Sequence, residues 1–439
     1  MQILAHGLGG RSDLPIPLWM AIYGGAAALL ISFFALAAFW TKPKLKGDDA
    51  GRPLGQGFER FVDSIWTRGA LRLLSVLLFL LSLAIALAGP NDSSQNPVPT
   101  WFYVWFWVGL VPVSILFGPV WKVVNPLRTL TRGIVRFVHG TDASVRPIPE
   151  RMGYWPAVGS LAAFLWLELV YDEADAPLVV ATFIILYSVM QAVGGARFGE
   201  RWHERGDGFE VYANLIARMS PLGRRSDGRL VFRSPFNGLS GLARDPALVP
   251  VVAVILGSTA FDGLTRTEWW VDLATDASRP AYLLLGTAGL GGCIFFVLFS
   301  YRLAVASSKR FLEGDARRLD GAFIHSLIPI AVGYTVAHYF SLFVFQGQAG
   351  YILASDPLYL GWDLFGIAQL RINYTAVSTS LIAYVQILSI VTGHIFGVVA
   401  AHDRAVEIFP EESKSRAQYS LLAVMVLYTT VGIALLVGT

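Results

Sequence analysis

The sequence predicts an all-α membrane protein, a bundle of about ten transmembrane helices with both termini outside. Of its 439 residues, 54% are hydrophobic and only 15% are charged, whereas a soluble globular protein has about 25% charged residues. The apolar residues form long runs, close to the roughly 20 residues that one helix needs to cross a bilayer. The basic residues gather in alternate loops between these runs, as they do in membrane proteins with a fixed orientation.

Ten runs are predicted to cross the membrane, and the fourth is the shortest. They are 17–40, 70–89, 101–120, 155–171, 177–195, 246–264, 280–302, 320–345, 375–400 and 417–437. If the N-terminus is outside, the five loops on the inside hold 29 of the 34 Lys and Arg residues. Cytoplasmic loops carry such an excess, which supports both the number of crossings and the orientation.

The whole chain, 1–439, is predicted to form a single integral membrane domain with two basic inside loops, 121–139 and 196–246. In 207–222, apolar residues including Phe209 and Tyr212 recur at helical spacing. Such basic amphipathic segments usually lie on an anionic leaflet, and docking on a cytoplasmic partner is the alternative. Residues 226–235 are predicted to form a short strand or hairpin. His203 falls in the second loop and carries no special signal.

The net charge of +3 gives no basic field that would indicate a nucleic-acid partner. The single cysteine, Cys293, excludes an intramolecular disulfide and any cysteine-cluster metal site. The partner that the composition does predict is the lipid bilayer, with its anionic inner leaflet.

Two histidines at similar depth predict an intramembrane polar site on the inner side. His325 and His394 lie in the eighth and ninth runs, each inward of the middle of its helix. Pro329 removes the hydrogen bond to the carbonyl of His325, so that carbonyl needs another partner. Ionisable groups in hydrocarbon often mark ion or proton pathways. The alternative is that both rings simply make interhelical hydrogen bonds.

A second set of polar residues predicts an outer vestibule. Asp262 ends the sixth run with Ser258 one turn back, and His338 shares a helix face with Tyr334. The pair Asp262 and His338, joined by His6 from the N-terminal arm, would supply the three ligands that a catalytic zinc commonly takes. The sequence therefore makes a divalent metal the candidate cofactor. The alternative is that Asp262 faces water at the end of its helix and binds no metal.

Five stretches together resemble a family of polytopic, mainly actinobacterial membrane proteins of unestablished role, some labelled fenitrothion hydrolase-like. They are His-Gly-Leu-Gly-Gly-Arg-Ser-Asp-Leu-Pro-Ile-Pro at 6–17, Val-Asn-Pro-Leu-Arg-Thr-Leu at 124–130, Gly-Asp-Gly-Phe-Glu-Val-Tyr at 206–212, Leu-Gly-Ser-Thr-Ala-Phe-Asp-Gly at 256–263 and Ala-His-Tyr-Phe-Ser at 337–341. The resemblance implies a multi-pass protein of a bacterial cytoplasmic membrane. The label implies hydrolysis of organophosphate esters, although it brings no assigned catalytic residue.

Three functions follow as hypotheses. The first is a transporter or permease for a small molecule or ion, with His325, His394 and Pro329 as the inner site and Asp262 and His338 at the outer entrance. The second is a membrane-embedded metal-dependent hydrolase, with the metal on His338, Asp262 and His6. The third is a non-catalytic subunit or assembly factor of a membrane complex. Whether the protein is an enzyme is left open by the sequence.

Overall fold

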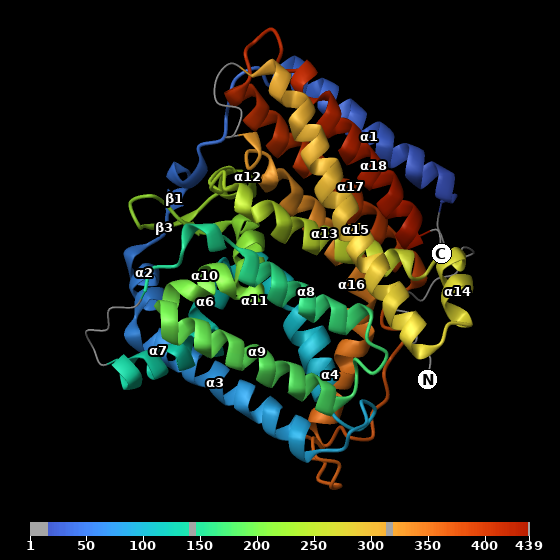
Figure 1. Cartoon of the computed structure of the whole chain (residues 1–439). Helices are drawn as coiled ribbons and strands as arrows, with labels where there is room; N and C mark the ends of the chain where they lie inside the picture. The colour runs from blue at the N-terminus through green and yellow to red at the C-terminus, as the bar shows by residue number, and fades with distance from the viewer. Residues whose placement is uncertain (1–15, 140–145, 313–318, 438–439) are drawn as a thin grey trace. The chain divides into compact units, whose positions relative to one another are not determined.

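The chain folds as an all-α polytopic bundle. The computed structural model describes residues 16–139, 146–312 and 319–437 (Figure 1). Within these residues, nine helical segments are long and apolar enough to cross a membrane. They are Leu18–Phe39, Ile65–Ala88, Val98–Phe117, Pro177–Gly206, Pro246–Leu264, Arg279–Phe311, Ile324–Ala354, Thr379–Ile408 and Arg416–Leu435. The apolar runs become helices because a helix satisfies every backbone polar group within one segment.

The fourth predicted crossing is also a helix, but a short one. It is α8, Trp155–Leu169, with 15 residues, or roughly 22 Å at 1.5 Å per residue. That is less than the ~30 Å of a bilayer core. The excess of basic residues inside nevertheless depends on this crossing, because removing it would place the arginine-rich loop after α9 (Pro177–Phe198) on the outside. The tenth crossing therefore stays a prediction that rests on charge.

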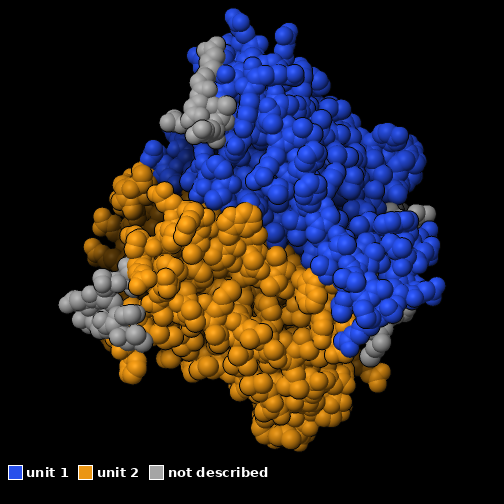
Figure 2. Space-filling model, viewed as in Figure 1, with its two compact units in different colours: residues 1–50, 235–342, 375–439 blue, residues 51–234, 343–374 orange. Residues whose placement is uncertain are grey.

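The described chain divides into two compact units, coloured separately in Figure 2. Unit 1 comprises 1–50, 235–342 and 375–439, and unit 2 comprises 51–234 and 343–374. The expectation of one membrane domain stays a prediction, and each unit is described by itself.

Unit 1 is built around two buried helices. They are α13 (Val249–Leu264) and the part of α16 (Ile324–Ala354) up to residue 342. Its other elements are α1 (Leu18–Phe39), η2 (Gly47–Asp49), α12 (Pro235–Ser240), η7 (Pro246–Leu248), α14 (Glu268–Thr275), α15 (Arg279–Ser308), η8 (Lys309–Phe311), α17 (Thr379–Ile408), η10 (Arg416–Gln418) and α18 (Tyr419–Val437). α13 is buried along almost all its length, and α15 and α18 pack on it.

Glycines let α16 and α17 approach closely. A Cβ at Gly393 would lie 2.5 Å from the carbonyl oxygen of Pro329, and one at Gly333 would lie 2.4 Å from that of Ser389. Small residues at such contacts let helix backbones pack against each other in membranes. α16 continues as a helix through Pro329.

Unit 2 combines long helices with short ones. The long elements are α3 (Ile65–Ala88), α8, α9, and the end of α16 from residue 343. The shorter ones are α2 (Gln56–Asp63), α4 (Val98–Thr100), the π-helix η3 (Trp101–Val108), α5 (Leu110–Phe117), α6 (Trp121–Val124), α7 (Pro126–His139), η4 (Glu150–Met152), η5 (Gly199–Trp202), α10 (His203–Gly206), α11 (Gly208–Ile216) and η6 (Ala217–Met219).

A small antiparallel sheet confirms the predicted strand near 226–235. Its strands are β1 (Arg52–Pro53), β2 (Leu222–Arg224) and β3 (Leu230–Phe232), in the order β1-β3-β2. β3 is central, and its Phe232 aligns with Arg52 on one side and with Leu222 on the other.

The predicted surface location of 207–222 is wrong for α11. Eight of its nine residues are buried inside unit 2, whereas an interfacial helix would leave one face open. Phe209 explains the difference, because its ring packs within 5.0 Å of those of Phe106, Phe164 and Tyr187. This aromatic core draws the apolar side of α11 inward. α7, in contrast, keeps Phe137 exposed.

Candidate functional site

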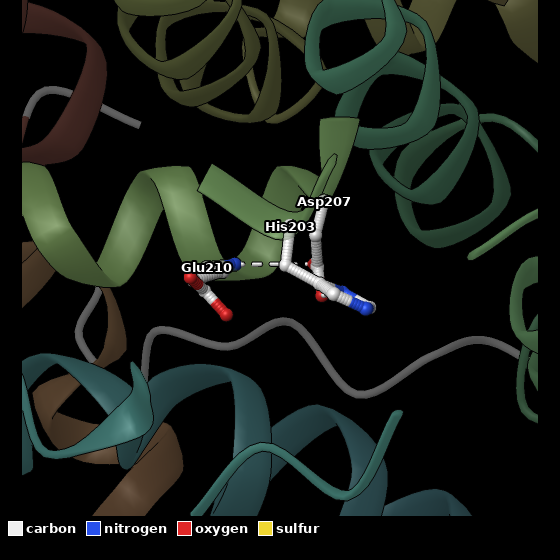
Figure 3. Close-up of side chains that lie close together, drawn as sticks. All are labelled: His203, Asp207 and Glu210. Carbon is white, nitrogen blue, oxygen red and sulfur yellow. Dashed lines mark hydrogen bonds and ion pairs between the residues drawn. The ribbon is translucent and has the colours of Figure 1, made fainter. Parts of the chain in front are cut away.

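The start of α11 carries a buried acidic cluster in unit 2. Asp207 caps the helix, and its side chain accepts hydrogen bonds from the backbone N–H groups of Phe209 and Glu210 at 3.1 and 3.2 Å. Aspartate favours this position because the first turn of a helix has N–H groups without partners. His203 lies one turn before Asp207, so His203, Asp207 and Glu210 project to the same side (Figure 3).

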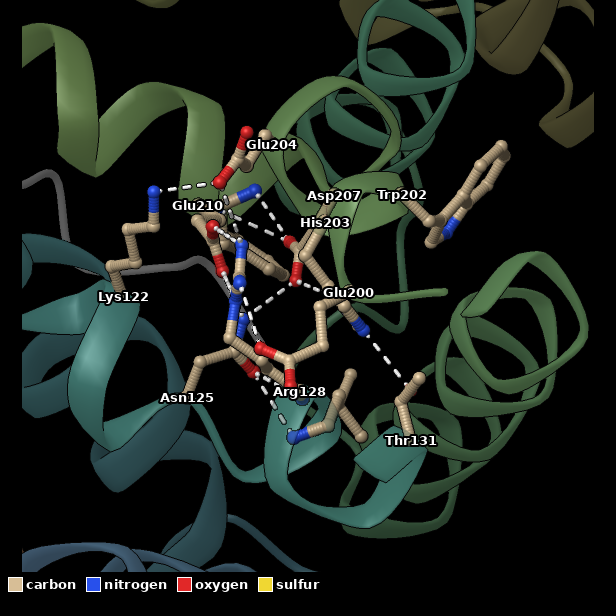
Figure 4. A network of polar contacts seen from close by, with 12 residues as sticks. Lys122, Asn125, Arg128, Thr131, Glu200, Trp202, His203, Glu204, Asp207 and Glu210 are labelled. Atoms are coloured by element: carbon tan, nitrogen blue, oxygen red, sulfur yellow. Dashed lines mark hydrogen bonds and ion pairs between the residues drawn. The ribbon is translucent and has the colours of Figure 1, made fainter. Parts of the chain in front are cut away.

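α7 supplies the groups that neutralise this cluster. Asn125 precedes α7, and its amide nitrogen donates to Asp207 Oδ2 at 2.9 Å and to Glu210 Oε2 at 3.0 Å. The Arg128 guanidinium donates to both carboxylate oxygens of Glu210 (Figure 4). The Arg128 and Glu210 side chains are 4% and 0% exposed, so this ion pair is fully withdrawn from water. We call Asn125, Arg128, His203, Asp207 and Glu210 the unit 2 network.

A more exposed set of charges surrounds the unit 2 network. Arg132 binds Glu200 through two nitrogens at 2.6 and 2.7 Å, and Lys122 binds Glu204 at 2.6 Å. The Glu200, Glu204 and Lys122 side chains are 43–45% exposed. Ion pairs in such positions contribute little to stability, and the buried pair is the one that matters.

The partners of the two buried charges shift their pKa values. Burial alone would raise the pKa of Asp207, but the hydrogen bond and charge of His203 and the hydrogen bonds from Tyr187 and Asn125 together lower it. Burial likewise opposes the charged form of Arg128, but its contacts with Glu210 raise its pKa above the ordinary value. Both groups are therefore held in their charged forms.

His203, Asp207 and Glu210 have the composition of a metal site but not the surroundings of one. One ligand atom from each lies within 4.8 Å of the others. The carboxylate of Glu210 is already held by Arg128, and Asn125 donates to both acids. A divalent cation would have to displace the guanidinium or lie beside it, against the repulsion of like charges. The donor set therefore fits an ion-paired network better than a metal centre.

His203 also links a hydroxyl to a carboxylate. Its Nε2 lies 3.0 Å from Thr131 Oγ1 and its Nδ1 lies 3.3 Å from Asp207 Oδ2. In a catalytic triad, a hydroxyl nucleophile, a histidine base and a carboxylate are linked in this order. Thr131 and His203 are 1% and 0% exposed, however, and neither lines the cavity described next. The contacts hold the His203 ring in place.

A cavity of about 550 Å³ adjoins the unit 2 network. Its walls come mainly from α3, η3 and α9, and they are aromatic and aliphatic. They include Leu71, Leu74, Leu78, Trp101, Phe102, Trp105, Trp121, Phe183 and Phe209. Asn125, Tyr187 and Asp207 form its polar end. Cavities of this size and composition bind small molecules in many proteins.

Unit 1 brings together the predicted outer residues Asp262 and His338. An oxygen of Asp262 on α13 contacts His338 Nε2 on α16. Arg266, one turn after Asp262, reaches the same Nε2 at 2.8 Å and Asp262 Oδ1 at 3.5 Å. Tyr334 stacks on the His338 ring, with centroids 5.9 Å apart. We call Asp262, Arg266 and His338 the unit 1 triad.

The other residues of the outer set do not join the triad. Ser258 donates to the carbonyl oxygen of Ile255 in its own helix at 2.9 Å. His6, the expected third metal ligand, lies outside the described residues. The Arg266 guanidinium lies against Asp262 and His338, where a metal ion would bind. Its positive charge would repel a divalent metal.

The two inner histidines are buried and bonded to backbone carbonyls. His325 Nε2 lies 3.1 Å from the Ala400 oxygen across the contact of α16 with α17, and His394 Nδ1 lies 2.8 Å from the Ile390 oxygen in its own helix. The bond of His325 is an interhelical hydrogen bond, the alternative to an ion or proton pathway. The bond of His394 stays within its own helix. No hydrogen bond joins the two rings within the described chain.

Sequence reasoning missed the unit 2 network and Arg266. One signal was present: the stretches 124–130 and 206–212, which carry the family resemblance, contain Asn125, Arg128, Asp207 and Glu210. The spacing of His203, Asp207 and Glu210 was another, since it places all three on one side of a helical segment.

No family model, no curated protein and no solved structure matches this chain.

Proposed function

We propose that this protein is a proton-coupled membrane transporter, a permease for an ion or small molecule, in which the unit 1 triad takes up and releases the proton. One observation carries the proposal: His338 Nε2 is in contact with both a donor, Arg266, and an acceptor, Asp262.

A single ring nitrogen serves these two partners only in alternation. When Nε2 has no proton, its lone pair accepts a hydrogen bond from Arg266. When Nε2 is protonated, it donates to Asp262, and Arg266 must move away. A proton at Nε2 would therefore separate Arg266 from His338 and leave it with Asp262, to which it is already 3.5 Å away. Such a change is a two-state element that a proton can bias.

The location of the triad supports this role. Asp262 and His338 are 7% and 1% exposed and lie on the two helices around which unit 1 is built. Placing an ionisable side chain in the apolar part of a bilayer costs free energy. Where such side chains do occur, they commonly form the proton relays of pumps and transporters. The Nδ1 of His338 and the Tyr334 hydroxyl have no hydrogen-bond partner among the described residues. They offer places where water or a substrate would bind.

The hydrolase hypothesis has less support. It rests on the family resemblance, and catalytic zinc commonly needs three protein ligands. The described residues provide His338 and Asp262 together with a cation, Arg266. The resemblance also supports a location in the cytoplasmic membrane of a bacterium.

The first test detects protonation of the triad. The full chain is reconstituted in liposomes on a solid-supported membrane, and the transient current after a pH jump is recorded. We expect a charge displacement that His338→Gln and Asp262→Asn abolish. His325→Gln should keep it, because His325 is likewise buried but bonded to a backbone carbonyl. Currents that are equal in all variants, or no larger than in protein-free liposomes, would overturn the role of the triad.

The second test detects transport. Proton flux into pyranine-loaded proteoliposomes is followed while salts, amines, carboxylic acids and sugars are added one at a time. At least one class should drive flux in the wild type and none in His338→Gln. If no class does so, the protein is not a proton-coupled transporter of these solutes, and a role as a subunit of a membrane complex gains support.

A further inference from the structure

The unit 2 cavity is a groove that opens along α3. Leu71, Leu74 and Leu78 line it and are 39%, 53% and 54% exposed. Trp101 and Trp105 of η3 line it as well, with stacked rings. In a helix that is apolar enough to cross a membrane, such exposed leucines face lipid tails rather than water. The groove therefore suits an acyl chain that enters from the side.

Arg72 follows Leu71 in α3 but does not itself line the groove. Its side chain has no ion pair among the described residues, and its Nε is buried without a hydrogen-bond partner. The charges that act on it are those of Arg132, Arg68 and Arg128, opposed by Glu200. Arg72 lies seven residues into α3, roughly 10 Å from its start. From that depth an arginine reaches the headgroup region.

Two other donors nearby also lack an acceptor. Arg132 uses two of its nitrogens for Glu200, and its Nη1 is buried without a partner. The indole N–H of Trp121, which lines the groove, is buried without one too. Buried donors normally have acceptors. The acidic end of the groove does not supply them, since Asp207 already accepts from Tyr187, Asn125 and the backbone.

We propose that this groove binds an anionic phospholipid of the bilayer, with an acyl chain along α3 and η3 and the phosphate on Arg72 and Arg132. The phosphate supplies a negative charge for Arg72 and acceptor oxygens for the unpartnered Arg72 Nε and Arg132 Nη1, and arginine binds phosphate in a favourable planar geometry. An oxygen of the headgroup or ester accepts from Trp121. The site lies in unit 2 and does not depend on the unit 1 triad.

The test is native mass spectrometry of the full chain, released from a neutral detergent and titrated with phosphatidylglycerol or phosphatidylcholine. We expect one phosphatidylglycerol per chain to bind at least tenfold more tightly than phosphatidylcholine. Arg72→Gln should reduce that affinity about tenfold or more, the loss expected for a charge-assisted hydrogen bond. Arg72→Lys should retain part of it, and serves if Arg72→Gln fails to fold.

Two further variants test whether the change in lipid affinity is specific to the groove. Arg136→Gln removes an exposed arginine one turn after Arg132 in α7 and should leave the affinity within about twofold. Ser188→Phe fills the groove from α9 and should weaken both lipids.

Three results would overturn the proposal. Equal affinity for the two lipids would show that the groove does not select charge. Equal losses for Arg72→Gln and Arg136→Gln would show that the attraction is not local. Full competition by glycerol 3-phosphate at millimolar concentration would show that the phosphate group is bound without the chain.

Discussion

Loss of Glu210 should destabilise the protein far more than loss of an exposed acid in the same region. Glu210→Gln keeps the shape of the side chain but removes its charge. The Arg128 guanidinium, 4% exposed, then loses its buried ionic partner and keeps the exposed Glu200 at 3.4 Å and Glu204 at 3.8 Å. Breaking a buried ion pair by removing one partner costs about 3–5 kcal/mol. Asn125 still donates to the amide oxygen, so the lower part of this range applies.

Glu204→Gln is the matched control. Glu204 pairs with Lys122 at 2.6 Å, and both side chains are more than 40% exposed; Glu204 lies 3.8 Å from Arg128, farther than Glu210 does. Exposed pairs contribute about 0–1 kcal/mol. Replacing the buried pair as a whole, with Arg128→Met and Glu210→Met together, should cost less than Glu210→Gln alone, because no unpaired charge remains.

The assay is titration of the protein with SDS in mixed micelles, followed by circular dichroism, which gives the free energy of unfolding for each variant. A cost below about 1 kcal/mol for Glu210→Gln, or a cost equal to that of Glu204→Gln, would refute the reasoning. Either result would mean that Arg128 finds water or another acceptor at little expense.

Three further predictions concern packing, pH and topology. Gly393→Ala should destabilise the contact of α16 with α17, because the new Cβ would lie 2.5 Å from a backbone oxygen. Gly291→Ala in α15 is the control, since its Cβ would meet nothing within 4 Å, and it should be neutral or slightly stabilising. Melting temperatures in detergent compare the two variants. The pKa of Asp207 is lower folded than its ordinary value of 3.8, so its contribution to stability is present above that value and is lost as the pH falls through the folded pKa. SDS titrations above and below this window should show a loss that Asp207→Asn does not share. Reporters fused at Arg151 and Asp172, on either side of α8, should lie on opposite faces of the membrane, and the same face for both would remove the tenth crossing.

Much of the architecture could be predicted because it depends on local composition. A long apolar run has one way to satisfy its backbone in a bilayer, so nine of the crossings follow from the runs themselves. The meeting of Asp262 and His338 was expected because both lie in the outer half of their predicted runs, 246–264 and 320–345, although His338 lies near the middle of α16. Arg266 was missed because it falls beyond the apolar run, although it is one turn from Asp262 on the same face.

The unit 2 network could not be predicted from position alone. Asn125 and Arg128 lie 82–85 residues from the acids that they bind, and nothing local joins an arginine of α7 to a glutamate of α11. The burial of α11 depends on aromatic rings from several helices. The π-helical form of η3 also has no signature in a run of apolar and aromatic residues. Tertiary contacts of this kind override the pattern of a single segment.

The separation of Arg128 and Glu210 has a consequence for biosynthesis. The two residues are 82 positions apart, with α8 and α9 between them. At 5–20 residues per second, the ribosome needs about 4–16 s to make the chain between them. Arg128 therefore emerges long before its counter-ion and must wait in contact with water or lipid headgroups. The buried arrangement forms only after α9 has been inserted and α11 follows it. This order makes Glu210 the last residue of the unit 2 network to be made, so a chain that stalls before it would present Arg128 without its buried counter-ion to the quality-control machinery of the membrane.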